Sequence, residues 1–149
     1  MQIGTICQRD VVKVGKTASI LDAARAMRSH HVGNVVVVDE IEGIEKPIGI
    51  VTDRDIVVEL VAKEVDLGAV DVVDVMSLTV VTTQHDADLF ETLRFMGVKG
   101  VRRLPVLDDD GALFGIVSVK DAMAALFKEL SFVADISARQ IERERRTRE

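Results

Sequence analysis

The chain has 149 residues, of which 48% are apolar and 3% aromatic, and its formal net charge is -6. This length can bury one compact core or two small packed halves. The negative charge argues against a broad nucleic-acid-binding surface, and the lack of Trp and Tyr removes the aromatic platforms on which single strands stack.

Several negative features narrow the class of protein. The single cysteine, Cys7, cannot form an internal disulfide, and no CxxC or Cys/His cluster is present to hold a metal. The pair His30 and His31 is expected at a helix end, where a cation is favoured, and no further metal ligands accompany it. The first ten residues lack a signal-peptide core, and every later apolar run is cut by a charge. We therefore expect a soluble, cytoplasmic protein without a bound metal.

The most informative feature is an internal repeat, in which residues 11–60 align with residues 80–126. The matched pairs include Val11 with Val80, Ala18 with Ala87, Met27 with Met96, Asp39 with Asp108 and, after a loop insertion near residues 40–46, Asp55 with Asp121. The conserved order of these pairs indicates two copies of one structural unit.

The first copy begins with a β-branched run at residues 11–14, which predicts a strand. A helix follows, with Ser19 as a suitable N-cap. Its core face is predicted from the helical spacing of Ile20, Ala23, Ala24 and Met27. Apolar strands are expected at residues 34–38 and 47–51, and a second helix at residues 53–61. Residues 63–76, broken by Gly68, link the two copies.

The second copy repeats this series, with strands expected at residues 78–82, 104–107 and 113–117. Its first helix is predicted to be capped by Asp86 and to bury Leu89, Leu93 and Met96. The acidic sequence of residues 108–111 predicts a compact hairpin turn. A second helix is expected at residues 119–127.

Each copy thus reads as a β-α-β-β-α unit in an α+β fold. Because the open face of such a small sheet is rich in Val, the two copies should pack sheet against sheet with pseudo-twofold symmetry. We expect the first repeat, with its N-terminal segment and linker, at residues 1–76, the second repeat at 77–133, and a charged helical tail at 134–149. The symmetry predicts two equivalent ligand clefts where the copies meet.

The third strand of each copy ends in a similar heptapeptide, Gly-Ile-Val-Thr-Asp-Arg-Asp at residues 49–55 and Gly-Ile-Val-Ser-Val-Lys-Asp at residues 115–121. The glycine lets a ligand approach the backbone, the Thr or Ser hydroxyl lies near a helix N-terminus that favours anions, and the Asp can accept two hydroxyl hydrogen bonds. Ribose plus phosphate satisfies all three. The alternative is that Thr52 and Ser118 only cap helices whose dipoles Asp55 and Asp121 offset.

Two such motifs in register closely resemble the CBS (cystathionine beta-synthase) domain family, over residues 5 to 130. The resemblance implies a Bateman module that binds AMP, ADP, ATP or another adenosyl ligand such as S-adenosylmethionine, requires no cofactor, and forms a homodimer. It implies that Asp121 and Asp55 hold ribose, that Ser118 and Thr52 face phosphate, and that Ile116 and Ile50 contact adenosine. It also places Val12 and Cys7 beside Asp121, and Val81 and Met76 beside Asp55.

Two arginines distinguish the predicted clefts. Arg102 and Arg103 precede the second strand of the second copy, where the first copy has Gly33 and Asn34. Because guanidinium groups suit bidentate phosphate contacts, we expect the Asp121 cleft to be the stronger nucleotide site. The alternative is an exposed pair that forms ion pairs with residues 108–110.

The sequence shows no catalytic constellation, since a GxSxG elbow, a P-loop and a nucleophile with an ordered base are all absent. We expect a regulatory ligand-binding module and not an enzyme. One alternative is a ligand-independent dimerisation or scaffold module, and another is a nucleic-acid-binding protein that uses the five arginines of the tail. The alternating Arg and Glu of that tail favour an exposed helix, although a contact to a second subunit or another partner also fits.

Overall fold

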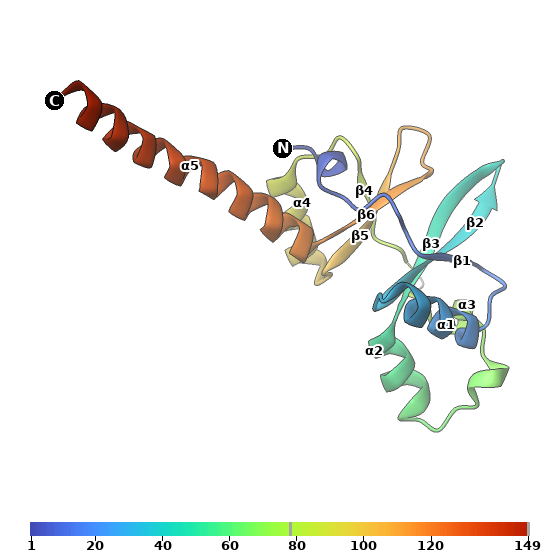
Figure 1. Ribbon diagram of the computed structural model, residues 1–149. Coiled ribbons are helices and arrows are strands. Elements are labelled where there is room, and N and C mark those ends of the chain that lie inside the picture. Colours follow the sequence, from blue (N-terminus) through green and yellow to red (C-terminus); the bar gives the residue numbers. More distant parts are fainter. Residues whose placement is uncertain (78, 149) are drawn as a thin grey trace.

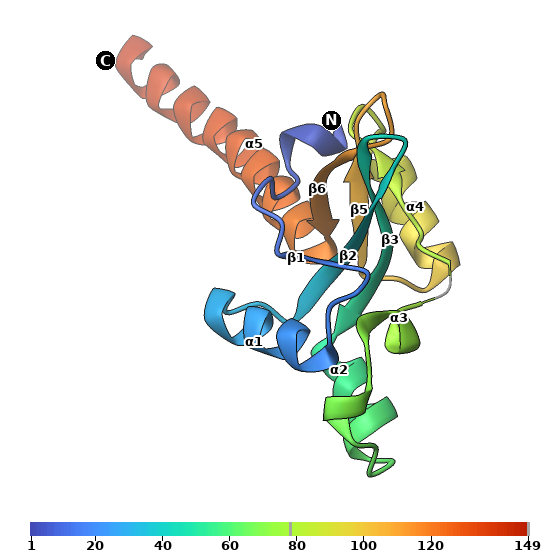
Figure 2. The same cartoon turned by 90° about the vertical axis from the view of Figure 1, so that its right-hand side faces the viewer.

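The computed structural model describes residues 1–77 and 79–148. It contains two three-stranded sheets of the same topology (Figure 1). In the first sheet, β1 (Lys13–Gly15) pairs parallel with β2 (Asn34–Ile41), which pairs antiparallel with β3 (Ile44–Thr52). In the second, β4 (Thr83–Gln84), β5 (Arg103–Leu107) and β6 (Leu113–Ser118) repeat this order. The sheets contact each other through β3 and β6 (Figure 2). The predicted α+β fold of two equivalent units is confirmed.

The first helix of each repeat packs one apolar face on its sheet. Helix α1 (Ile20–His30) is capped as predicted, because the Ser19 side chain accepts a hydrogen bond from the backbone N–H of Asp22. Helix α4 (Leu89–Lys99) is capped by Asp88 and not by Asp86. The Asp88 carboxylate lies directly before the helix, where it accepts from the N–H groups of Phe90 and Glu91 at 2.8 and 3.2 Å.

The strands differ from the prediction in their ends. β2 and β3 continue toward each other to a tight turn at Glu42 and Gly43, whose φ values of 56° and 76° are both left-handed. The inserted residues therefore lengthen the hairpin and do not form a loop. β1 and β4 are short and start later than predicted; of the strand expected at residues 78–82, Leu78 lies outside the described residues.

The second helices differ in length between the repeats. In the first, α2 (Asp53–Asp55) continues into a π-helical segment, η2 (Ile56–Val61), which buries Ile56 and Leu60. In the second, a single helix, α5 (Val119–Thr147), runs on through the predicted tail and extends away from both sheets (Figure 1). None of the helices among the described residues combines the length and the apolar character needed to cross a membrane.

The segments that precede the repeats are exchanged between them. The first segment, with the 3-10 turn η1 (Ile3–Thr5), packs on the second repeat, where the Ile3 N–H donates to the carbonyl oxygen of Ala87 at 2.9 Å. The linker, with η3 (Leu67–Ala69) and α3 (Val72–Val75), packs on the first repeat through a bond from the Val72 N–H to the Ala18 carbonyl at 3.0 Å. Residues 1–9 thus pack on the second repeat, although they precede the first repeat in the sequence.

Each repeat has its own hydrophobic core. The first core includes Met27, Val35, Val51 and, from the linker, Val72. The second core includes Met96, Leu104, Val117 and, from the N-terminal segment, Ile3. Since both exchanged residues are completely buried, the two segments hold the repeats together by apolar burial as well as by backbone hydrogen bonds.

Candidate functional site

In both motifs, the Thr or Ser caps the helix that follows the strand, and the Asp completes the capping box. In the second repeat, the backbone N–H and the hydroxyl of Ser118 donate to Oδ2 of Asp121 at 2.8 and 2.5 Å. In the first, the Thr52 N–H donates to Oδ2 of Asp55 at 2.9 Å, and the Asp55 N–H donates to Oγ1 of Thr52 at 3.1 Å. Helix capping therefore occurs at both motifs, and in each carboxylate these cap bonds use Oδ2 alone, which leaves Oδ1 for another donor.

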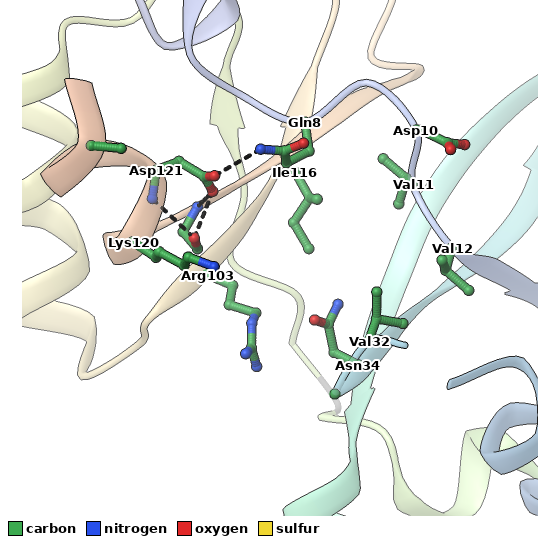
Figure 3. A pocket seen from close by; sticks show the side chains of 13 residues that line it. Gln8, Asp10, Val11, Val12, Val32, Asn34, Arg103, Ile116, Lys120 and Asp121 are labelled. Carbon is green, nitrogen blue, oxygen red and sulfur yellow. Dashed lines mark hydrogen bonds between the residues drawn. The ribbon is translucent and has the colours of Figure 1, made fainter. Parts of the chain in front are cut away.

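The first cleft, which we call the Asp121 cleft, has a volume of about 600 Å³ and lies between the two repeats (Figure 3). It is lined by Gln8, Asp10, Val11, Val12, Val32, Gly33, Asn34, Arg103, Ile116, Ser118, Lys120, Asp121 and Ala124. Figure 3 shows the motif residues on one side and the first repeat with its leading segment on the other.

The second cleft, the Asp55 cleft, has a volume of about 630 Å³. It is lined by Ile50, Thr52, Asp53, Arg54, Asp55, Val75, Ser77, Thr79, Val80, Val81, Gly100, Val101, Arg102 and Arg103. The two linings correspond almost residue by residue under the internal repeat, with Ile50, Thr52 and Asp55 in the places of Ile116, Ser118 and Asp121. The structure thus contains two pseudo-symmetric clefts.

The crossing of the chain places Val12 in the Asp121 cleft and Val81 in the Asp55 cleft. Cys7 and Met76 instead lie against the motif glycines. A Cβ atom on Gly115 would come within 2.8 Å of the Cys7 sulfur, and one on Gly49 within 2.5 Å of the Met76 sulfur. The glycines therefore make room for the protein's own exchanged segments. Burial raises the pKa of the Cys7 thiol although Arg9 opposes the rise, which suits a small packing residue.

The two arginines do not both face Asp121. Arg102 lines the Asp55 cleft, whereas Arg103 lines both clefts. The reason is the same crossing: the start of the second strand in one repeat faces the motif of the other, so Arg102 takes the place that Gly33 has in the Asp121 cleft. Among the described residues, the side chain that contacts the turn at residues 108–110 is His85 and not an arginine, and its Nε2 lies 3.0 Å from Oδ1 of Asp109. Charge therefore gives no reason to prefer the Asp121 cleft.

Gln8 is the main site residue that the sequence analysis missed. Its Nε2 donates to Oδ1 of Asp121 at 2.9 Å, the oxygen that the helix cap leaves free (Figure 3). Burial raises the pKa of Asp121, but hydrogen bonds from Ser118 and Gln8 outweigh it, and the net pKa lies below the usual value. The carboxylate is thus an ionised acceptor. Gln8 directly follows Cys7, which the family resemblance places beside Asp121, so that placement could have indicated Gln8.

The segment around Gln8 is fixed to β6 from two sides. Gln8 and Ile116 exchange both backbone hydrogen bonds, at 2.8 and 2.9 Å. The Arg9 guanidinium lies over the Phe114 ring at 3.4 Å from its centre, a cation–π contact. Because the Ile116 backbone is already bonded to Gln8, its side chain is the part of this residue that faces the cleft.

Comparisons with known proteins agree with this architecture. The family model described as CBS domain matches residues 3–62 and 72–128. An uncharacterized protein of Methanopyrus kandleri, MK0525, is 37% identical over 123 residues, which cover 83% of this chain and 61% of that protein. The present chain therefore spans about three-fifths of the length of that relative.

Two solved structures show the same fold. The structure described as a putative signal-transduction protein with CBS domains from Burkholderia ambifaria has a TM-score of 0.74 and 27% identity, with 85% of this chain and 93% of that chain covered. The CBS domain pair of MJ0100, in complex with 5'-methylthioadenosine and S-adenosyl-L-methionine, has a TM-score of 0.72 and 24% identity, with 87% and 97% covered. The chain belongs to the CBS domain family and consists mainly of a tandem pair of CBS domains.

Proposed function

We propose that this CBS pair is a regulatory module that binds an adenosine nucleotide or another adenosyl ligand and performs no catalysis. The observation that carries the proposal is the presence of two clefts that each combine a motif carboxylate, a hydroxyl at a helix start and Arg103. In the Asp121 cleft, exchange of Gln8 for two ribose hydroxyls would keep Oδ1 of Asp121 hydrogen-bonded. Arg103, which lines both clefts, would then meet phosphate.

The proposal predicts that adenosyl ligands raise the melting temperature of the protein. A ligand at 100 times its dissociation constant stabilises the folded state by about 2.7 kcal/mol. We would measure the melting temperature with AMP, ADP, ATP, S-adenosylmethionine, 5'-methylthioadenosine and GTP. S-adenosylmethionine and 5'-methylthioadenosine are included because MJ0100, which has a similar fold, was solved in complex with them. Each ligand-induced shift in melting temperature is measured relative to the same variant without ligand. The destabilisation caused by loss of a helix cap therefore does not contribute to the shift.

The double variant Asp121→Ala with Asp55→Ala should abolish the shift, because both ribose acceptors are gone. The control is Asp135→Ala, which removes a carboxylate from an exposed position on α5, far from both cleft linings. Shifts that survive the double variant, or that GTP produces equally, would contradict adenosyl binding at these sites.

Substitution of Arg102 or Arg103 distinguishes ligand binding at the two clefts. Arg103→Ala should weaken phosphorylated ligands at both sites, whereas Arg102→Ala should weaken them only at the Asp55 cleft, each by roughly tenfold for a lost charge-assisted contact. Calorimetric titration of single-site backgrounds, Asp55→Ala and Asp121→Ala, measures the two affinities independently. Equal effects of the two substitutions in both backgrounds would refute the assignment.

A homodimer is also part of the proposal. The helices expose valines in groups, Val57, Val58 and Val61 on η2 and Val98 on α4, and Val98 is 83% exposed. Such apolar helix faces suit a contact between two copies. A ligand then acts on a downstream partner only if it binds two arrangements of the pair with different affinity.

A ligand-independent scaffold is the second candidate function. It is favoured by the cap bonds at both motifs and by the Gln8 contact, because these satisfy much of each carboxylate without ligand. The absence of any melting shift across the ligand panel would support this function over ligand sensing.

A further inference from the structure

The outer part of α5 has no contact that covers its apolar side chains. The helix is anchored by the buried Ala122 and the half-buried Leu126, but every described residue from 127 to 148 is exposed. At 1.5 Å per residue, this outer part extends about 30 Å beyond the sheets (Figure 1). Most of the stability of a helix in a protein comes from tertiary packing of its apolar face, and this part of α5 has no such packing within the chain.

The exposed residues of this part are large and apolar. Phe127, Leu130, Val133 and Ile136 are between 61% and 66% exposed, and Ile141 is 54% exposed. A solvated helix face would be polar at such positions. The composition therefore indicates a surface that another molecule covers.

The spacing of the apolar residues indicates that the covering molecule is a helix. One line of side chains, which we call the α5 seam, follows alternating steps of four and three residues: Met123, Phe127, Leu130, Ala134, Ser137 and Ile141. This is the heptad repeat of a left-handed coiled coil, in which two helices interlock along a narrow line. Phe132, Val133 and Ile136 lie outside the seam, with Val133 about 60° and Ile136 about 120° around the helix from Leu130.

The sizes of the seam residues indicate an antiparallel partner with the same sequence. If two copies of the seam are aligned antiparallel about position 132, Phe127 lies opposite Ser137 and Leu130 opposite Ala134, so that large residues face small ones. Met123 then faces Ile141. In a parallel pair, Phe127 would face Phe127 and Ala134 would face Ala134. The phenylalanine layer would then be overcrowded, and the alanine layer would leave a void.

The charges of the helix agree with this direction. Four arginines, Arg139, Arg143, Arg145 and Arg146, lie in the last part of α5 and Arg148 directly follows it, whereas the first part carries Asp121, Glu129 and Asp135 against Lys120 and Lys128. A parallel pair would bring the two arginine-rich ends together, whereas the antiparallel alignment about position 132 separates them and places Arg143 opposite Asp121, at the cost of placing Asp135 opposite Glu129. The chain as a whole is acidic, which favours the same contact.

We propose that α5 pairs antiparallel with α5 of a second copy of this chain through the α5 seam. This contact is separate from the η2 and α4 faces and does not depend on ligand binding. It joins two CBS pairs with their bodies at opposite ends of a two-helix rod. A lipid surface fits less well, because Glu142 and Glu144 lie among the arginines that would have to face anionic headgroups.

A distance measurement between spin labels tests the pairing and its direction. The label is placed at Arg146→Cys, an exposed position of α5, in a Cys7→Ser background that removes the native thiol. The antiparallel pair predicts a narrow distance distribution near about 40 Å, since the labels lie 28 residues apart along the rod. A parallel pair would place the labels within about 20 Å of each other.

Leu130→Glu should abolish this distance, because it buries two charges in the seam. Ile136→Glu is the matched control, since it introduces the same charge at an equally exposed residue outside the seam and should leave the distance unchanged. A short distance, no dipolar signal in the parent protein, or equal effects of the two substitutions would overturn the proposal. The absence of signal would assign the seam to a different partner molecule.

Discussion

Ile3→Ala should destabilise the protein by about 2–5 kcal/mol, the usual loss for a truncated core isoleucine. Ile3 is completely buried in the core of the second repeat, although it lies at the start of the chain. Its backbone is held by the hydrogen bond to Ala87, so the segment cannot easily shift to refill the cavity. Chemical denaturation with a far-UV circular dichroism readout measures the change in the free energy of unfolding.

Ile41→Ala is the matched control for this prediction. Ile41 is 39% exposed near the tip of the β2–β3 hairpin, so its truncation leaves little cavity and should cost well under half as much. If the two substitutions had similar effects, or if Ile3→Ala were neutral, the N-terminal segment would not be part of the second repeat in solution.

Gly115→Ala should destabilise the protein by about 1–3 kcal/mol, as expected when an added methyl group overpacks a close contact. The new Cβ would lie 2.7 Å from the carbonyl oxygen of Gln8 and 2.8 Å from the Cys7 sulfur. The Gln8 contact is with backbone that Ile116 holds by two hydrogen bonds, so the strain cannot be relieved by rotation of a side chain. The substitution should therefore also displace Gln8 from Asp121.

Gly97→Ala provides a control with the opposite sign. Gly97 lies inside α4, and a Cβ there would meet nothing within 4 Å. Because alanine favours the helix over glycine, this variant should be up to about 1 kcal/mol more stable. Thermal and denaturant unfolding measures the stability of both variants relative to the parent. A Gly115→Ala protein as stable as the parent would show that the exchanged segment is not packed on β6.

Local features of the sequence predicted the elements of this fold well. The period of apolar residues and the Ser19 cap were sufficient to place α1, and the internal repeat was sufficient to predict two equivalent units. The cap at α4 was placed two residues early because Asp86 and Asp88 are both good caps and only the backbone geometry shows which carboxylate meets the free N–H groups. Strand ends at the β2–β3 turn were missed because pairing partners, and not the residues themselves, decide where a hairpin closes.

Some residues of the candidate site could be predicted from local sequence, and others could not. The motif residues Asp55 and Asp121 could be identified from the sequence, because their hydroxyl partners lie three residues away and the cap is a local structure. The neighbours that cross between the repeats could not be assigned in the same way. Gln8 reaches Asp121 over 113 positions of sequence, and Arg102 faces the cleft of the other repeat.

The sequence by itself determined the two-copy α+β architecture, the position of the two motifs and the residues on each core face, since these follow from patterns within a few turns of the chain. Only the tertiary structure decided that residues 1–9 complete the second repeat, that Arg103 is shared by both clefts and that the apolar side chains of α5 are left uncovered. These depend on which surfaces of distant segments meet, and burial between distant segments is a property of the folded chain.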